Sequence, residues 1–153
     1  FAFRKNLVQN EGVITTVKEG VSTDGKPVLT IGAGVSNRNT FWPKGLKAGD
    51  TASQAVINSS FFDASNEAAK IGVNVARATG INSKESILLF SEMAYQGGSA
   101  IGTGKQYIPM IQSMKSGNVE EAIKAFTSTP VYMDAGAARR QHYKDLIIKA
   151  MKG

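Results

Sequence analysis

The stretch QNEGVITTVKEGVSTDGKPVLTIGAGV, residues 9–35, decides the fold class because it joins a helix-like run to two strand-like runs. Just before it, apolar residues at roughly helical spacing predict a short helix over residues 1–8. Within it, VITTVKEGV and VLTIGAGV are rich in β-branched residues, and STDGKP has the Asp-Gly and Pro of a turn. The sequence therefore predicts a β-hairpin directly after the first helix.

The remainder of the chain is predominantly helical in pattern. Residues 36–50 have no period and many helix breakers, which predicts a loop. A long helix then runs to about Thr79, and further helices are expected over SILLFSEMAY, VEEAIKAFT and residues 135–151. The expected helix starts are marked by Thr51 with Gln54, Asn82 with Glu85, Asn118 with Glu121, and Asp134. We predict an α+β fold whose sheet is confined to the N-terminal third.

Composition narrows the possible functions. The 153 residues predict one domain, and 42% hydrophobic with 20% charged residues is typical of a soluble globular protein. There is no cysteine and one histidine, His142, so thiolate chemistry and a His-rich metal site are excluded, and we expect no metal or cofactor. The formal net charge of +6 favours polyanions such as nucleic acid, anionic membrane or cell-wall polymer.

No apolar run approaches the roughly 18 residues that cross a bilayer. Because the sequence begins at Phe1 and has no charged-then-apolar signal segment, we expect a processed chain or a domain excised from a larger one.

Glu11 is the first candidate for chemistry. Four-residue steps place Phe3, Leu7 and Glu11 on one helix face, with Glu11 at its C-terminal end. Burial and the negative end of the helix dipole both disfavour a carboxylate there, so we expect a raised pKa, as a general acid near neutral pH requires. Gly12 allows the chain to turn sharply after it. The alternative is an ordinary solvated carboxylate at a helix end.

A Glu-Gly pair, a hairpin and Thr-Ile-Gly-x-Gly follow one another as NEG (residues 10–12) and TIGAG (30–34). This combination resembles the phage T4-type lysozymes, which are muramidases that cut bacterial peptidoglycan. AYQGG (94–98), MKSGNVEEAIKAF (114–126) and GAARRQHYKDLI (136–147) are similar to later segments of the same family. The resemblance spans essentially the whole chain. It implies one lysozyme-like domain over residues 1–153, with an N-terminal helix and hairpin lobe, a long connecting helix and a C-terminal helical lobe.

The resemblance also implies roles for individual residues. Glu11 would protonate the glycosidic oxygen, and the hydroxyl of Thr30 would hold the attacking water. In the family's register Val17 pairs with Thr30, which keeps the Thr30 side chain within reach of the cleft. Val35 stands where the family often has a histidine, which we expect to remove a structural polar contact rather than activity.

The second carboxylate departs from the family. The family's Asp lies nine residues after the Glu and six before the Thr, and these positions here are Gly20 and Asp24. The hairpin is therefore four residues longer, and both Asp24 and Glu19 are candidates, with Asp24 preferred. An Asp before Gly is also ordinary turn chemistry.

Further residues are candidates for binding the glycan, namely Gln96, Arg139, Arg140 and Trp42. Their alternatives are an incidental amide at a helix end, a solvated basic helix and an aromatic that pins its loop. Glu92, amid apolar residues, is expected to be buried and paired with an arginine, and it is the rival acid. His142 is expected on the surface or in the core rather than in catalysis.

The expected function is a hydrolase of bacterial peptidoglycan, antimicrobial and bacteriolytic, that acts in the periplasm or cell wall. The alternatives are a lytic transglycosylase with a single Glu and a non-catalytic peptidoglycan-binding module. The expected partners are glycan strands, and we expect no membrane partner. Nucleic acid is not expected either, because the aromatic residues are not interleaved with the basic ones. We expect a monomer, or one part of a larger delivery protein; phage endolysin, virion component and bacterial effector all fit the sequence.

Overall fold

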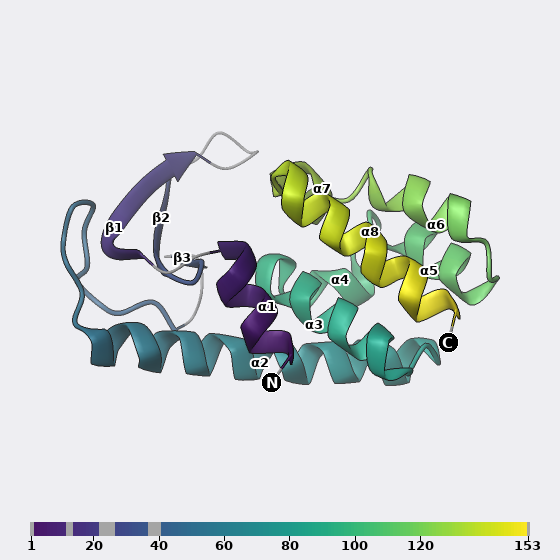
Figure 1. Ribbon diagram of the computed structural model, residues 1–153, viewed down its shortest axis with the longest axis horizontal. Helices are drawn as coiled ribbons and strands as arrows, with labels where there is room; N and C mark the ends of the chain where they lie inside the picture. The colour runs from purple at the N-terminus through teal and green to yellow at the C-terminus, as the bar shows by residue number, and fades with distance from the viewer. Residues whose placement is uncertain (1, 12–13, 22–26, 37–40, 153) are drawn as a thin grey trace. The chain divides into compact units, whose positions relative to one another are not determined.

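The structure, a computed structural model, describes residues 2–11, 14–21, 27–36 and 41–152 (Figure 1). The side chains of residues 2, 10, 11, 21 and 27 also lie outside this description. Helices dominate the described chain, and three antiparallel strands form one small sheet in its N-terminal third. The predicted α+β class is therefore confirmed.

The chain divides into two compact units, Phe1–Glu67 and Ala68–Gly153, called unit 1 and unit 2 below. The boundary falls inside helix α2 (Gln54–Thr79), which is the long helix that the sequence predicts. The hydroxyl of Ser53 accepts a hydrogen bond from the Val56 amide at 3.2 Å, so Ser53 takes the capping role that was predicted for Thr51.

Unit 1 begins with helix α1 (Ala2–Glu11), which is longer than the predicted residues 1–8. The predicted hairpin is confirmed as strands β1 (Ile14–Val21) and β2 (Pro27–Gly32), and β1 is long and curved (Figure 1). The second predicted strand is interrupted, because Gly32 (φ 62°) and Gly34 (φ 87°) turn the chain back into a third strand, β3 (Val35–Ser36). The sheet order is β1-β2-β3.

The register of the hairpin differs from the expected one. Lys18, and not Val17, pairs with Thr30. Between the pairs Ile14–Gly32 and Lys18–Thr30, three residues of β1 lie opposite the single residue Ile31 of β2. This irregularity has no turn or glycine to mark it in the sequence, and a one-residue change of register moves a side chain to the other face of the sheet.

Unit 2 is built around helix α3 (Lys84–Gly97), whose side chains Leu89, Phe90 and Met93 are fully buried. The central position that its nearly all-round apolar pattern predicts is thus confirmed. Helix α3 packs against the short helices α4 and α7 and the terminal helix α8, while α5 and α6 pack together and α6 also contacts α8. These helices span Ala100–Thr103 (α4), Ile108–Lys115 (α5), Val119–Phe126 (α6), Pro130–Asp134 (α7) and Ala137–Lys152 (α8).

The helix starts of unit 2 test the capping predictions. The side chain of Asn118 accepts from the Glu121 amide at 3.1 Å, as predicted. Ser83, one residue after the predicted Asn82, caps α3. Asp134 does not cap the last helix, because it ends α7 and α8 begins only at Ala137. None of the helices within the described residues is long and apolar enough to cross a membrane.

Candidate active site

Glu11 is the last residue of α1, and β1 begins three residues later at Ile14. Leu7, one turn before it on the same face, is 3% exposed. The backbone of Glu11 therefore occupies the predicted position at the C-terminal end of the helix. Its side chain lies outside the described part of the structure, so its raised pKa stays a prediction.

Arg4 fixes α1 on the first half of α2. Its Nε donates to the hydroxyl of Ser65 at 2.9 Å, and its Nη2 donates to the side-chain oxygen of Asn66. The guanidinium also lies 4.7 Å from the centroid of the Phe62 ring, within the range of a cation–π contact. Three contacts from one side chain hold the helix that ends at Glu11.

Thr30 lies on the accessible face of the sheet. Its neighbour Ile31 is fully buried and pairs with Val35, which is 1% exposed, so these two face the core of unit 1. Successive residues of a strand face opposite sides, and directly paired residues share a side. Thr30 therefore shares the outer face with its two partners, Lys18 and Ser36. Lys18 is exposed, and Thr30 and Ser36 are half-buried.

A groove of about 470 Å³ runs along the first part of β1. It is lined there by the five consecutive residues from Ile14 to Lys18. The far edge of β1 is closed by the segment that precedes α2: Val17 donates to the Asp50 carbonyl at 2.8 Å, and Ala52 donates to the Thr15 carbonyl at 2.9 Å. These hydrogen bonds satisfy backbone groups that the irregular register leaves unpaired with β2. Among the described residues, the lining of the groove thus begins three residues after Glu11 and ends at the partner of Thr30.

Of the two candidates for the second carboxylate, only Glu19 lies within the described residues. Glu19 is exposed and pairs with Leu29, so it belongs to the face opposite Thr30. Asp24 lies in residues 22–26, outside the described residues. The regular ladder continues from Lys18–Thr30 to Val21–Pro27, which is roughly 10 Å at about 3.3 Å per residue.

Trp42 is half-buried in the segment between β3 and α2. The same segment contributes Phe41 and Pro43 to a second groove of about 330 Å³, which the first turns of α2 complete. Trp42 does not line either groove among the described residues. Its predicted role in stacking on a sugar stays a prediction.

The remaining candidates belong to unit 2. Gln96 is exposed in the last turn of α3, and Arg139 lies in the first turn of α8 with its Nε buried. Arg140 is engaged within its own unit: it donates to the carbonyls of Tyr132 at 2.9 Å and Met133 at 3.3 Å, and it lies 4.2 Å from the Tyr132 ring centroid. Arg140 thereby joins the end of α7 to α8. These contacts use part of its hydrogen-bonding capacity, and the glycan contact of Arg140 stays a prediction.

Glu92 is buried, as the sequence predicts, but its observed partner is a histidine. The Nε2 of His142 lies 2.6 Å from the Glu92 carboxylate, which is 1% exposed, and this contact connects α3 with α8. The Tyr143 hydroxyl also donates to the backbone carbonyl of Glu92 at 3.3 Å. Burial raises the pKa of Tyr107, another core residue of unit 2. Glu92, His142 and Tyr143 thus connect α3 with α8.

Sequence reasoning missed Lys18 as a neighbour of Thr30. The register between β1 and β2 would have revealed it, but an irregularity between Ile14 and Lys18 shifts that register from the expected one. No protein-family model, curated protein or solved structure matches the chain. The resemblance to the T4-type lysozymes remains an expectation carried by the motifs of the sequence.

Proposed function

We propose that the protein is a muramidase that cleaves the β-1,4 bond between N-acetylmuramic acid and N-acetylglucosamine in peptidoglycan. Glu11 acts as the general acid, and Thr30 holds the attacking water. The proposal combines the ordered motifs of the sequence with the arrangement of unit 1.

The observation that carries the proposal is the path from Glu11 to Thr30. The acid is the last residue of α1, the chain enters β1 at once, and β1 pairs with the strand that presents Thr30 on its accessible face. The described lining of a groove of about 470 Å³ runs along β1 from Ile14 to Lys18, and Lys18 is the partner of Thr30. An acid and a water-binding hydroxyl beside an open groove are what hydrolysis of a long polymer needs, because the polymer must enter from the side.

The chemistry follows from these roles. Glu11 gives its proton to the glycosidic oxygen while the bond from that oxygen to C1 breaks. The water held by Thr30 forms the new bond to C1, and its remaining proton passes to solvent. The products are two chains, one of which has a new reducing end. A general acid contributes about 10²–10⁴-fold to such a step.

Digestion of purified peptidoglycan tests the proposal. Wild-type protein should lower the turbidity of the suspension and release fragments whose reducing ends take up hydride from borohydride, as mass spectrometry can show. Glu11→Gln should stay folded and lose this activity. A folded wild-type protein that binds the peptidoglycan and releases no fragments would instead be the non-catalytic binding module.

One observation favours a second candidate, a lytic transglycosylase. Glu19 belongs to the face opposite Thr30, so the described residues offer no second carboxylate on the face of Thr30; Asp24 lies outside them. Inverting hydrolases hold their two carboxyls about 6.5–9.5 Å apart. With Glu11 alone, the 6-hydroxyl of N-acetylmuramic acid can attack its own C1 and give a 1,6-anhydro end.

The two candidates give different products. Hydrolysis gives reducible ends, whereas the transglycosylase gives anhydro ends that are lighter by one water and do not take up hydride. Asp24→Asn and Glu19→Gln complete the test. If both folded variants keep the wild-type rate, neither carboxylate is the base, and the mechanism depends on Glu11 and Thr30.

The site of action under this proposal is the bacterial cell wall. The formal charge of +6 attracts the protein to anionic wall polymers, which increases the local concentration of substrate. Glycan strands of the wall are the proposed partner.

A further inference from the structure

Lys18 and Thr30 form a polar row with Ser36 across the three strands. The three residues are direct partners, with Lys18 on β1, Thr30 on β2 and Ser36 on β3, and they share the accessible face of the sheet. Lys18 also ends the stretch of β1 that lines the groove of about 470 Å³. The row consists of one ammonium and two hydroxyls, and it has no acidic member.

The charge of Lys18 has no partner within the described part of the chain. No carboxylate there forms an ion pair with it, and its side chain is exposed. The neighbouring acid on β1, Glu19, belongs to the opposite face. A cation left open beside a groove is ready to bind an anionic group of a ligand.

We infer that Lys18 is a specificity-determining residue that binds a carboxylate of the glycan. This inference rests on the proposed function. N-acetylmuramic acid differs from N-acetylglucosamine by a lactyl group, whose carboxylate is free where no peptide stem is attached; where a stem is attached, the lactyl carboxyl is an amide and the anionic groups are the carboxylates of the stem. The Cβ atoms of paired residues are about 4.5–5.5 Å apart, so a sugar whose C1 faces the water held by Thr30 comes within reach of the flexible Lys18 stem.

The register gives Lys18 this role. If Val17 had paired with Thr30, an apolar side chain that is 3% exposed would stand in this row, and Lys18 would face the other side. The irregularity in β1 replaces that apolar neighbour with a cation. Lys18 thereby favours a carboxylate-bearing sugar at this position over a neutral one.

Binding of two soluble tetrasaccharides tests the inference. One probe is the N-acetylglucosamine tetramer, which is neutral, and the other is the alternating tetramer of N-acetylglucosamine and N-acetylmuramic acid with free lactyl carboxylates. Isothermal titration calorimetry is performed in the Glu11→Gln background, so that the ligand is not cleaved. Lys18→Met removes the charge and keeps the stem, and Lys18→Arg keeps the charge.

Lys47→Met is the matched control, because Lys47 is an exposed lysine of unit 1 outside the groove, and both Met variants have the same net charge. Lys18→Met should weaken binding of the carboxylate-bearing tetramer about fivefold, the size of a solvent-exposed ion pair. The neutral tetramer should bind as before. Lys18→Arg and Lys47→Met should bind both probes like the parent protein.

Three results would overturn the inference. Equal weakening by Lys18→Met and Lys47→Met would leave only a general charge effect, and equal weakening for both tetramers would indicate a role in packing. Failure of the parent protein to bind either tetramer would remove the glycan itself as ligand. Selective binding through Lys18, in a wild-type protein that cleaves no peptidoglycan, would instead uphold the inference and reject the proposed hydrolase.

Discussion

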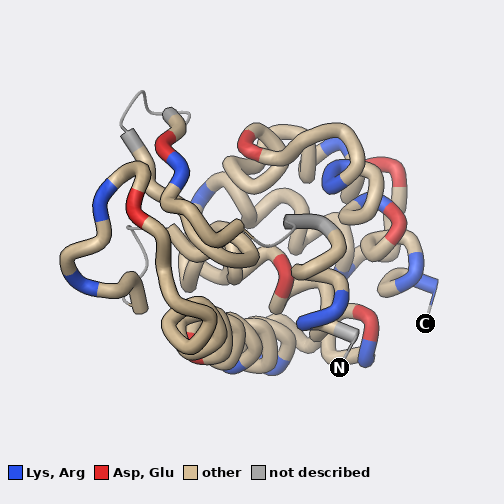
Figure 2. Tube along the Cα trace, turned by 60° about the vertical axis from the view of Figure 1, so that its left-hand side comes forward, with Lys and Arg blue, Asp and Glu red and all other residues tan. Residues whose placement is uncertain are grey.

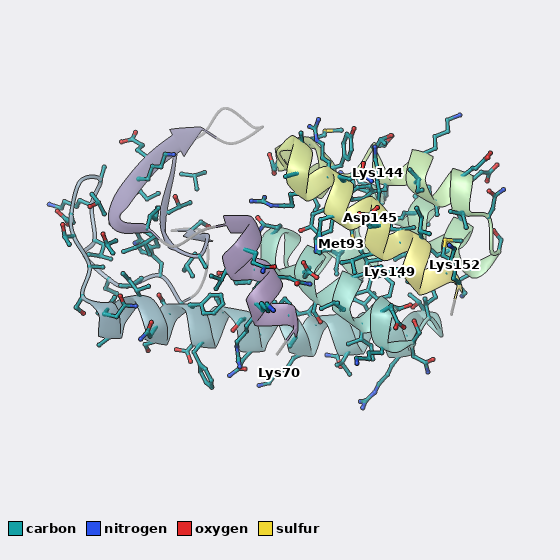
Figure 3. All side chains as sticks on the ribbon, in the orientation of Figure 1. Lys70, Met93, Lys144, Asp145, Lys149 and Lys152 are labelled. Carbon is teal, nitrogen blue, oxygen red and sulfur yellow. The ribbon has the colours of Figure 1, made fainter. Side chains whose placement is uncertain are left out.

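Unit 1 and unit 2 distribute their charged residues differently. Unit 1 contains seven basic and six acidic residues, a formal net charge of +1, whereas unit 2 contains eleven basic and six acidic residues, a net charge of +5. Figure 2 shows the charged positions along the described chain, and Figure 3 marks Lys144, Lys149 and Lys152 along α8. Most of the excess positive charge of the protein thus belongs to unit 2.

The two units also use polar side chains differently. In unit 2, Glu92 is paired with His142 in the core, and Arg140 is bound to carbonyls of α7. In unit 1, Lys18, Thr30 and Ser36 form a row on an accessible face beside a groove. The comparison suggests that unit 1 provides the chemistry under the proposed function, and that unit 2 provides a stable basic body that attracts an anionic polymer.

The largest expected effect separates the acids of the two units. Glu11→Gln should lower the rate of peptidoglycan lysis by at least about 10²–10⁴-fold, because the amide cannot donate the proton. Glu92→Gln should keep the hydrogen bond to His142 and retain lysis within about threefold, since a satisfied structural group does not touch the reacting atoms. The measurement is the initial rate of turbidity loss for variants with native circular dichroism. Loss of lysis in Glu92→Gln together with retained lysis in Glu11→Gln would instead assign the acid to unit 2.

The core pair of unit 2 should matter for stability. His142→Ala removes one hydrogen-bond partner of a carboxylate that is 1% exposed, and the loss of such a partner by a buried polar group costs about 1–3 kcal/mol. Urea unfolding measures the change in the free energy of unfolding. His142→Gln, which offers an amide donor in the same place, should recover part of the loss. A change below about 0.5 kcal/mol in His142→Ala would mean that other contacts hold Glu92.

A smaller stability effect is expected in unit 1. Arg4→Met removes the hydrogen bonds to Ser65 and Asn66 and the contact with the Phe62 ring, which together should stabilise α1 by about 1–2 kcal/mol. Lys5→Met is the control, because Lys5 is the next residue on α1 and is exposed. Hydrogen exchange should show faster exchange of α1 amides in Arg4→Met alone. Identical exchange in the two variants would argue against the anchoring role of Arg4.

The smallest expected effect concerns attraction to the wall. The paired variant Lys149→Gln/Lys152→Gln removes two exposed charges of unit 2, and Lys44→Gln/Lys47→Gln removes two of unit 1. At about 0.1 M NaCl the unit 2 pair should lower sedimentation with purified peptidoglycan about twofold, and the unit 1 pair less. At about 1 M salt, where the Debye length is about 3 Å, all three proteins should sediment alike. A larger loss of sedimentation in the unit 1 variant than in the unit 2 variant would mean that unit 1, and not unit 2, provides the attraction to the wall.

Local signals in the sequence predicted much of unit 2. The all-round apolar pattern of SILLFSEMAY placed α3 in the core, and Asn118 caps α6 as its spacing with Glu121 predicts. Such signals depend on residues a few positions apart, so they can be read from one sequence. The errors at Ser53 and Ser83 amount to one or two residues, because several neighbouring polar side chains can each serve as a cap.

The candidate site was harder to predict for a physical reason. Glu11 and Thr30 were found from local motifs, but the partner of Thr30 depends on the register between two strands. That register is fixed by long-range contacts, here including the hydrogen bonds of Val17 with Asp50 and Thr15 with Ala52. The contact of Glu92 with His142 was likewise missed, because the two residues are fifty positions apart in the sequence.

The position of the unit boundary inside α2 has a consequence for how the chain can be rearranged. A cut between Glu67 and Ala68 would leave helical pieces of 14 and 12 residues, since α2 spans Gln54–Thr79. Isolated helices shorter than about 12–15 residues are marginal in water. After such a cut, each helical piece would depend on packing within its own unit. An exchange of segments between related chains should therefore keep the whole of α2 with one of the two exchanged parts, so that the helix stays intact.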